Sequence, residues 1–163
     1  MPTQTLSAYE QIGAAVPSIH RGQFSMVISG EGATRTLLNS ESGALCMFDR
    51  PAGIVYTLPA PVAGMRFTFA VGSTITSNAA KVVTNVTASV FLLGSVEMIS
   101  VSATTYPVVA VANGTNIAAI SANGTTTGGQ IGECYTVTAI SSTQWHISGI
   151  SVGTSVTTPF AAS

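Results

Sequence analysis

The stretch from Leu45 to Val71 constrains the fold more than any other part of the chain. Two apolar runs, Leu45–Phe48 and Ile54–Leu58, flank the segment Asp49–Gly53. This segment contains the residues of a tight turn, because proline presets φ and glycine accepts a positive φ. The two runs therefore predict a β-hairpin, with Asp49 capping its turn by accepting backbone N–H groups.

A second strand signal follows in the same stretch. Pro59 and Pro61 lack backbone N–H donors and so end the preceding run. In Met65–Val71, apolar residues then alternate with other residues. The residues expected on one face are Met65, Phe67, Phe69 and Val71. This period of two predicts a strand that is buried on one side.

Short runs rich in Val, Ile, Thr and Tyr continue through the chain, separated by Gly, Asn, Ser and Pro. The further strands expected are Phe24–Ser29, Arg35–Leu38, Lys81–Thr87, Val90–Leu93, Val96–Val101, Val108–Ala112, Ile117–Ile120, Tyr135–Ile140 and Gln144–Ser148. Roughly ten strands at this spacing predict an all-β fold, an antiparallel β-sandwich or barrel that is jelly-roll-like.

The first 23 residues differ from the rest, which divides the chain into an N-terminal arm (1–23) and a single β-domain (24–163). Apolar residues recur in the arm at helical spacing, but Gly13 and Pro17 interrupt them. The arm is expected either to order on a neighbouring protein or to fold back on its own domain. The residues expected to contact a partner are Tyr9, Ile12, Val16, Ile19 and Arg21.

Charged residues make up only 7% of the chain, against about 25% in an ordinary soluble domain. Hydrophobic residues make up 46%, and the mean hydropathy is +0.48. A free monomer of this composition would expose apolar area that association normally covers. The composition therefore predicts permanent interfaces with other subunits.

Several classes of protein do not fit the sequence. The five basic residues are scattered singly, whereas nucleic-acid binding needs clustered cations. The apolar stretch Ser89–Val101 is interrupted by Gly94 and Glu97, well short of the ~20 residues of a membrane span. The first residues lack the pattern of a signal peptide, which predicts a protein that is made in the cytoplasm and used without secretion by the cell that produces it.

The residues that carry catalysis are also sparse. His20 and His146 have no second ligand at metal-binding spacing, and the six carboxylates are spread along the chain. No nucleophile motif surrounds any serine. The sequence therefore predicts a protein without enzymatic activity, metal or cofactor. A small β-barrel enzyme would require the fold itself to bring carboxylates together.

Three residues are candidates for a subunit interface. Arg50 and Arg66 are expected to bridge to a neighbouring subunit, and Trp145 is expected to be a core or interface anchor. A sugar-stacking platform is the alternative role for Trp145.

Two further features are each given two interpretations. Cys46 and Cys134 are expected to be reduced, with a disulfide between them as the alternative. The uncharged segment Asn113–Gly132 is expected to be either a flexible loop or backbone packed in an interface.

The pattern D-R-x-x-G-I-x-x-T-L-P-A-P-x-x-G-M-x-F-x-F, from Asp49 to Phe69, resembles one found in head decoration (cement) and head-fibre proteins of tailed bacteriophages. The later residues Gly128-Gly129-x-x-Gly132, Trp145-x-x-x-Gly149 and Thr158-Pro159-Phe160 are similar to the carboxyl end of the same group. This resemblance implies a β-rich oligomer, often a homotrimer, that sits on a capsid and lacks catalytic residues.

The expected function is therefore that of a virion structural protein. It would bind the major capsid protein on the outside of a phage head and stabilise the shell, with the arm as the capsid-binding part. The alternative is a fibre or receptor-binding domain that recognises host surface glycan. The expected partners are the major capsid protein and further copies of the chain, and the expected location is the capsid surface of the virion.

Overall fold

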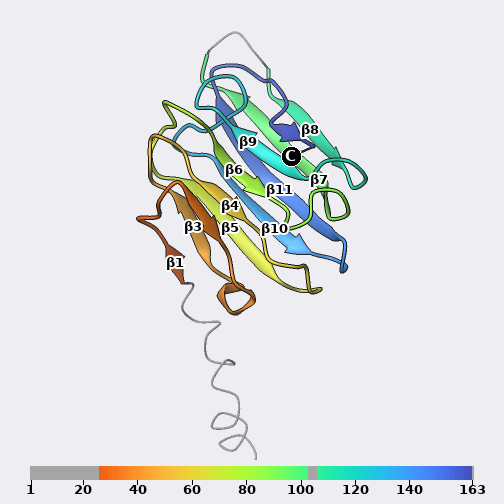
Figure 1. The fold of residues 1–163 in the computed structure, drawn as a ribbon. Helices are drawn as coiled ribbons and strands as arrows, with labels where there is room; N and C mark the ends of the chain where they lie inside the picture. Colours follow the sequence, from red (N-terminus) through yellow and green to blue (C-terminus); the bar gives the residue numbers. More distant parts are fainter. Residues whose placement is uncertain (1–25, 103–105, 163) are drawn as a thin grey trace, which may run out of the picture.

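The computed structural model describes residues 26–102 and 106–162. The expected arm, with Tyr9, Ile12, Val16, Ile19 and Arg21, lies outside the described residues. The described part is a sandwich of two β-sheets, and Figure 1 shows the strands of the two layers lying over one another. The expectation of an all-β sandwich is confirmed.

The larger sheet has seven strands. In spatial order they are β1 (Val27–Ile28), β3 (Leu45–Phe48), β5 (Arg66–Val71), β10 (Cys134–Ala139), β11 (Gln144–Gly153), β7 (Phe91–Ser100) and β8 (Val108–Asn113).

The smaller sheet has five strands. They are β12 (Phe160–Ala161), β9 (Ala119–Ala122), β6 (Ala80–Val83), β4 (Val55–Thr57) and β2 (Thr34–Thr36). A short 3-10 helix, η2 (Asn39–Glu41), precedes β3.

The core lies between the sheets and is rich in aromatic rings. Phe67, Phe69 and Val71 of β5 are buried, which confirms the one-sided strand expected there. Tyr56 of the smaller sheet lies with its ring centroid 5.2 Å from that of Phe48 and 5.6 Å from that of Phe69, both of the larger sheet. These contacts join the two layers, and ring pairs of this kind add to the burial of apolar area.

The hairpin expected around Asp49–Gly53 is wrong. β3 and β4 lie in different sheets, so the segment between them crosses from one layer to the other. β3 pairs in parallel with β5, and β4 in parallel with β2 and β6. A turn sequence between two apolar runs fits a hairpin within one sheet and also a crossing between two sheets. In either case alternate residues of each run are buried in the same core.

The expected antiparallel arrangement is also wrong in part. Among the described residues, five of the ten strand pairings are parallel, including the longest one, between β7 and β11. Both sheets are therefore mixed. The jelly-roll arrangement is not confirmed and stays a prediction.

β7 is one continuous strand, whereas the sequence predicts two strands separated at Gly94. Gly94 has φ 128°, and a Cβ placed on it would lie 2.2 Å from the carbonyl oxygen of Ile147 in β11. The glycine therefore allows close approach of two paired strands rather than a break between them.

The segment Asn113–Gly132 is neither a flexible loop nor uniformly exposed. It contains β9, and its glycines at positions 124, 128 and 129 are buried. Oδ1 of Asn123 accepts hydrogen bonds from the backbone N–H groups of Thr125, Thr126 and Thr127 at 2.8 to 3.2 Å. Local hydrogen bonds therefore stabilise the conformation of this uncharged segment.

Candidate functional site

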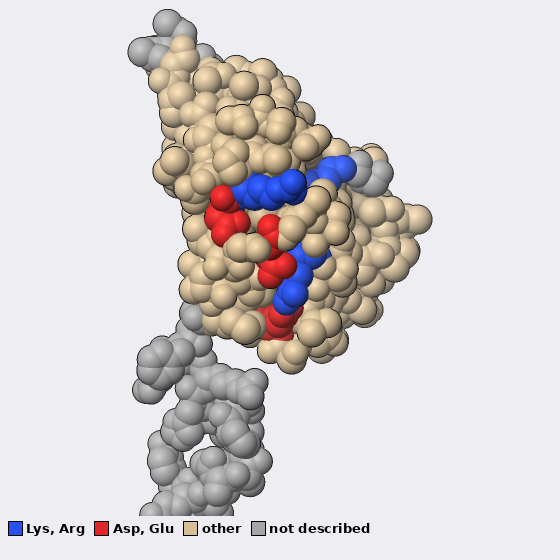
Figure 2. All heavy atoms as spheres, turned by 60° about the vertical axis from the view of Figure 1, so that its left-hand side comes forward, with Lys and Arg blue, Asp and Glu red and all other residues tan. Residues whose placement is uncertain are grey.

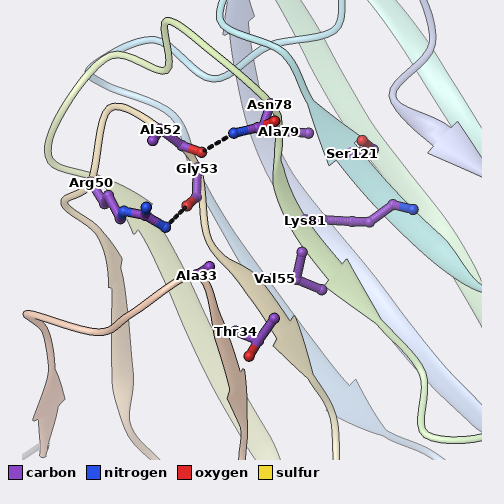
Figure 3. Close-up of a pocket in the computed structure, with 10 residues that line it drawn as sticks. All are labelled: Ala33, Thr34, Arg50, Ala52, Gly53, Val55, Asn78, Ala79, Lys81 and Ser121. Carbon is purple, nitrogen blue, oxygen red and sulfur yellow. Dashed lines mark hydrogen bonds between the residues drawn. The ribbon is translucent and has the colours of Figure 1, made fainter.

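The outer face of the smaller sheet carries a hollow of about 520 Å³. Its floor is one row of residues in register across four strands: Thr34 on β2, Val55 on β4, Lys81 on β6 and Ser121 on β9. Figure 3 shows this row and the residues around it. Because side chains of paired strands that lie opposite each other share a face, this row forms a continuous surface.

The turn that follows β3 forms one wall of the hollow. Nη1 of Arg50 lies 3.4 Å from the carbonyl oxygen of Gly53, and Nδ2 of Asn78 donates to the carbonyl oxygen of Ala52 at 3.1 Å (Figure 3). Gly53 has φ 76°, and a Cβ on it would lie 2.3 Å from the carbonyl oxygen of Ala79. The wall therefore requires glycine at this position.

The charges of the hollow favour an anionic ligand. Arg50 and Lys81 are the charged residues among its lining residues, and none of the carboxylates in the described ranges lines it. Thr34, Asn78 and Ser121 add uncharged polar groups. An anion with hydroxyl groups, such as an acidic sugar, matches this set of donors.

Other charged residues near this region are neutralised within the chain. Figure 2 shows Lys, Arg, Asp and Glu gathered in one band on the side of the molecule turned forward. Arg35 makes ion pairs with Glu41 and, at 3.8 Å, with Glu31. Oδ2 of Asp49 accepts a hydrogen bond from the backbone N–H of Gly30 at 2.6 Å, so it fastens β3 to the distant segment after β1 rather than capping its own turn.

A second cluster surrounds the buried carboxylate of Glu133. Its Oε2 accepts hydrogen bonds from the N–H of Gly129 (2.7 Å), Oγ of Ser151 (2.9 Å) and the N–H of Val152 (3.0 Å). Burial raises the pKa of Glu133, and these three hydrogen bonds oppose the rise. The carboxylate joins the start of β10 to the end of β11, so we assign it a structural role.

The three residues expected at a subunit interface lie in three different places. Arg50 lines the hollow, and Arg66 is exposed on the outer face of the larger sheet. Trp145 is completely buried and packs against Phe67, with ring centroids 6.0 Å apart. Its interface and sugar-stacking roles are therefore ruled out by burial within its own chain, and the core role is confirmed.

The two cysteines are free, and they lie on opposite faces of the larger sheet. Cys46 is buried in the core, which raises the pKa of its thiol to about 12. Cys134 is exposed on the outer face. This arrangement excludes the intramolecular disulfide, because the two side chains point away from each other.

The position of the strand β8 at an edge of its sheet is a feature that the sequence analysis did not predict. β8 is the last strand of the larger sheet, and Val109 and Val111 are 60% and 66% exposed. The strand was predicted from its sequence, and the structure buries its small residues Ala110 and Ala112 while its valines stay exposed. Only the sheet order shows that β8 lies at an edge.

The comparisons with known proteins identify no relative of the chain. No family model, no curated protein and no solved structure matches the chain. In the described part of the chain, no group of three or more His, Cys, Asp and Glu residues is placed to hold a metal ion. None of the helices described there has the length and apolar character to cross a membrane.

Proposed function

We propose that the protein is a non-enzymatic structural protein of a phage virion that binds the outside of the capsid and stabilises the shell. The observation that carries this proposal is the free edge of the larger sheet at β8. Its exposed residues are uncharged, three of them valines, and within the part of the chain that the structure describes the only strand paired with it is β7.

Free edges of this kind are normally protected. Natural sheets place lysine, proline or bulges on edge strands, because the unpaired N–H and C=O groups bind other extended chains. β8 has six residues and contains none of the charged residues or prolines that serve this purpose. It therefore suits the addition of a strand from a partner, with backbone hydrogen bonds supplying affinity and Val109 and Val111 contacting its side chains.

The partner in this proposal is an extended segment of the major capsid protein. A protein that binds only the assembled shell stabilises it by mass action, by about 2.7 kcal/mol per site when its free concentration is 100 times Kd. Many such sites on one shell add together. Stabilisation by contact needs no catalytic group.

The test is to add the purified protein to empty capsids made from the major capsid protein of the same genome. We expect the protein to co-sediment with the capsids and to raise the temperature at which they open. Capsids that open at the same temperature with saturating protein would contradict the proposal.

A second candidate function is recognition of host glycan, and the hollow with Arg50 and Lys81 favours it. An acidic sugar would place its carboxylate or sulfate beside these cations. The probes are a sialylated and a sulfated oligosaccharide, each compared with its neutral parent by titration calorimetry. Binding of an acidic sugar that is lost in Lys81→Ala would support this function, and equal weak binding of acidic and neutral sugars would rule it out.

A further inference from the structure

The outer face of the larger sheet carries almost no charge on its described strands. The strand registers place one row of outward-facing residues across six strands. In spatial order this row is Leu45, Thr68, Thr136, Ser148, Ser95 and Val111. Thr68 and Thr136 are in contact, with their hydroxyl oxygens 3.2 Å apart.

Two opposite charges flank this row. Arg66 lies two residues before Thr68 on β5, and Glu97 lies two residues after Ser95 on β7. Both are exposed, and neither makes an ion pair with any described residue. The other charged residues of the described part lie in the Arg35 ion pairs, in the lining of the hollow, in the interior for Glu133 or, for Asp49, in a hydrogen bond with the N–H of Gly30.

Arg66 and Glu97 cannot reach each other within one molecule. They are three strand spacings apart, and Arg66 is in register with Leu93, which is four residues before Glu97 on β7. At the usual spacings of a sheet, the two Cα atoms are about 20 Å apart. The midpoint between them falls at the centre of the row, between Thr136 and Ser148.

We propose that this face binds the same face of a second copy of the chain, with Arg66 of each copy paired with Glu97 of the other. A two-fold axis in the plane of the interface, perpendicular to the line from Arg66 to Glu97, makes both ion pairs at once. Such an isologous contact is the commonest form of self-association. The strands of the two sheets then cross at about 90°, which is one of the two known ways in which sheets pack.

The rest of the face is compatible with this partner. The small residues at its centre let two sheets approach to about 10 Å, and their hydroxyl groups can exchange hydrogen bonds across the contact. No Lys, Arg, Asp or Glu residue other than Arg66 and Glu97 lies on the strands β5, β10, β11 and β7 of this face. The low charge of the whole chain then has a physical reason at this surface.

This inference does not depend on capsid binding. It rests on Arg66 of β5 and Glu97 of β7, whereas the proposed capsid contact rests on β8, although the row of the self-association face ends at Val111 of that strand. It also differs from the homotrimer implied by the sequence resemblance, because two copies that bind face to face about a two-fold axis form a dimer.

Charge reversal tests the proposal. In Arg66→Glu and in Glu97→Arg, like charges meet twice in each dimer, so we expect the dimer Kd to rise about tenfold or more. The double variant Arg66→Glu/Glu97→Arg restores opposite charges and is expected to restore the dimer. The measurements are sedimentation velocity over a concentration series and circular dichroism, which confirms that each variant is folded.

The matched control is Thr36→Glu, which adds an acidic residue to an exposed position of the smaller sheet. It is expected to leave the dimer unchanged. A monomeric wild type, or an assembly that the single reversals do not weaken, would overturn the proposal. A charge-dependent trimer would keep the ion pair and overturn the two-fold arrangement.

Cys134 provides a second test that needs no substitution. It lies on the outer face two residues before Thr136, and the proposed axis passes beside it. The Cα atoms of the two Cys134 residues are then about 12 Å apart, and their thiols face each other. A bismaleimide with a two-carbon linker should join two chains at Cys134, because Cys46 is buried. Modification of each chain without cross-linking would contradict the axis.

Discussion

At the scale of single residues, Gly53 shows most clearly how the sequence determines the local structure. It combines φ 76° with a close approach to the backbone of Ala79, and the turn it belongs to connects the two sheets. In Gly53→Ala we expect a loss of about 2 kcal/mol or more in the free energy of unfolding, since the new Cβ meets backbone atoms that cannot move aside.

The matched control is Gly64→Ala. Gly64 has φ 94° but open space where a Cβ would lie, so this variant measures the cost of the positive φ alone. We expect a loss of about 1 kcal/mol there. Urea denaturation of both variants separates the two costs, and equal losses would show that the approach of Ala79 does not matter.

The buried Glu133 leads to a prediction about how the stability of the protein depends on pH. Because its pKa is raised in the folded state, its contribution to stability is fully present below the pKa of the unfolded chain and is lost as pH rises through the folded pKa. Glu133→Gln keeps an oxygen for the three donors and removes this titration. As pH rises above the ordinary range of a glutamate, the free energy of unfolding of the variant should therefore increase relative to that of the wild type. Parallel pH curves of the two proteins, from chemical denaturation, would contradict the account.

At the scale of elements, the strands were largely predictable and their partners were not. The alternation in Met65–Val71 predicts which residues of β5 are buried, because the period of a strand fixes its two faces. The same kind of pattern at β3 and β4 predicts a hairpin that does not form, since it contains no information about which strands pair.

For the candidate site, too, local features were predictable and the contacts between distant segments were not. Glycine at position 53 was predicted to take a positive φ, and it does. The hollow could not be predicted, because Lys81 and Arg50 are brought together by pairing between β4 and β6 and by the turn after β3. The burial of Trp145 likewise depends on where β11 lies in the sheet.

The prediction for single elements concerns the edge strand β8 and its proposed binding to the capsid. Val109→Lys and Val111→Lys place a charge on an exposed side chain, so each should change the free energy of unfolding by less than about 0.5 kcal/mol. Each should weaken binding to capsids about tenfold or more, because lysine on an edge strand opposes the addition of another strand.

The control for β8 is Thr36→Lys on β2, the edge strand of the smaller sheet. It should leave capsid binding unchanged. Binding that survives in both valine variants, measured by co-sedimentation, would mean that β8 is not the contact.

At the scale of the whole molecule, the low charge of the chain is the property that the proposed contacts explain. Apolar and uncharged surface remains at β8 and across the outer face of the larger sheet, while the ion pairs of Arg35 and the cations of the hollow lie elsewhere. A chain of this kind would act by binding partners that cover its apolar surface. Capsid binding would cover β8, and self-association would cover the outer face of the larger sheet.

The measurement that tests this account most directly is light scattering on a size-exclusion column, with and without empty capsids. The account predicts a species of twice the chain mass in the absence of capsids and co-migration with capsids when they are added. A monomer whose elution does not change when capsids are added would contradict it.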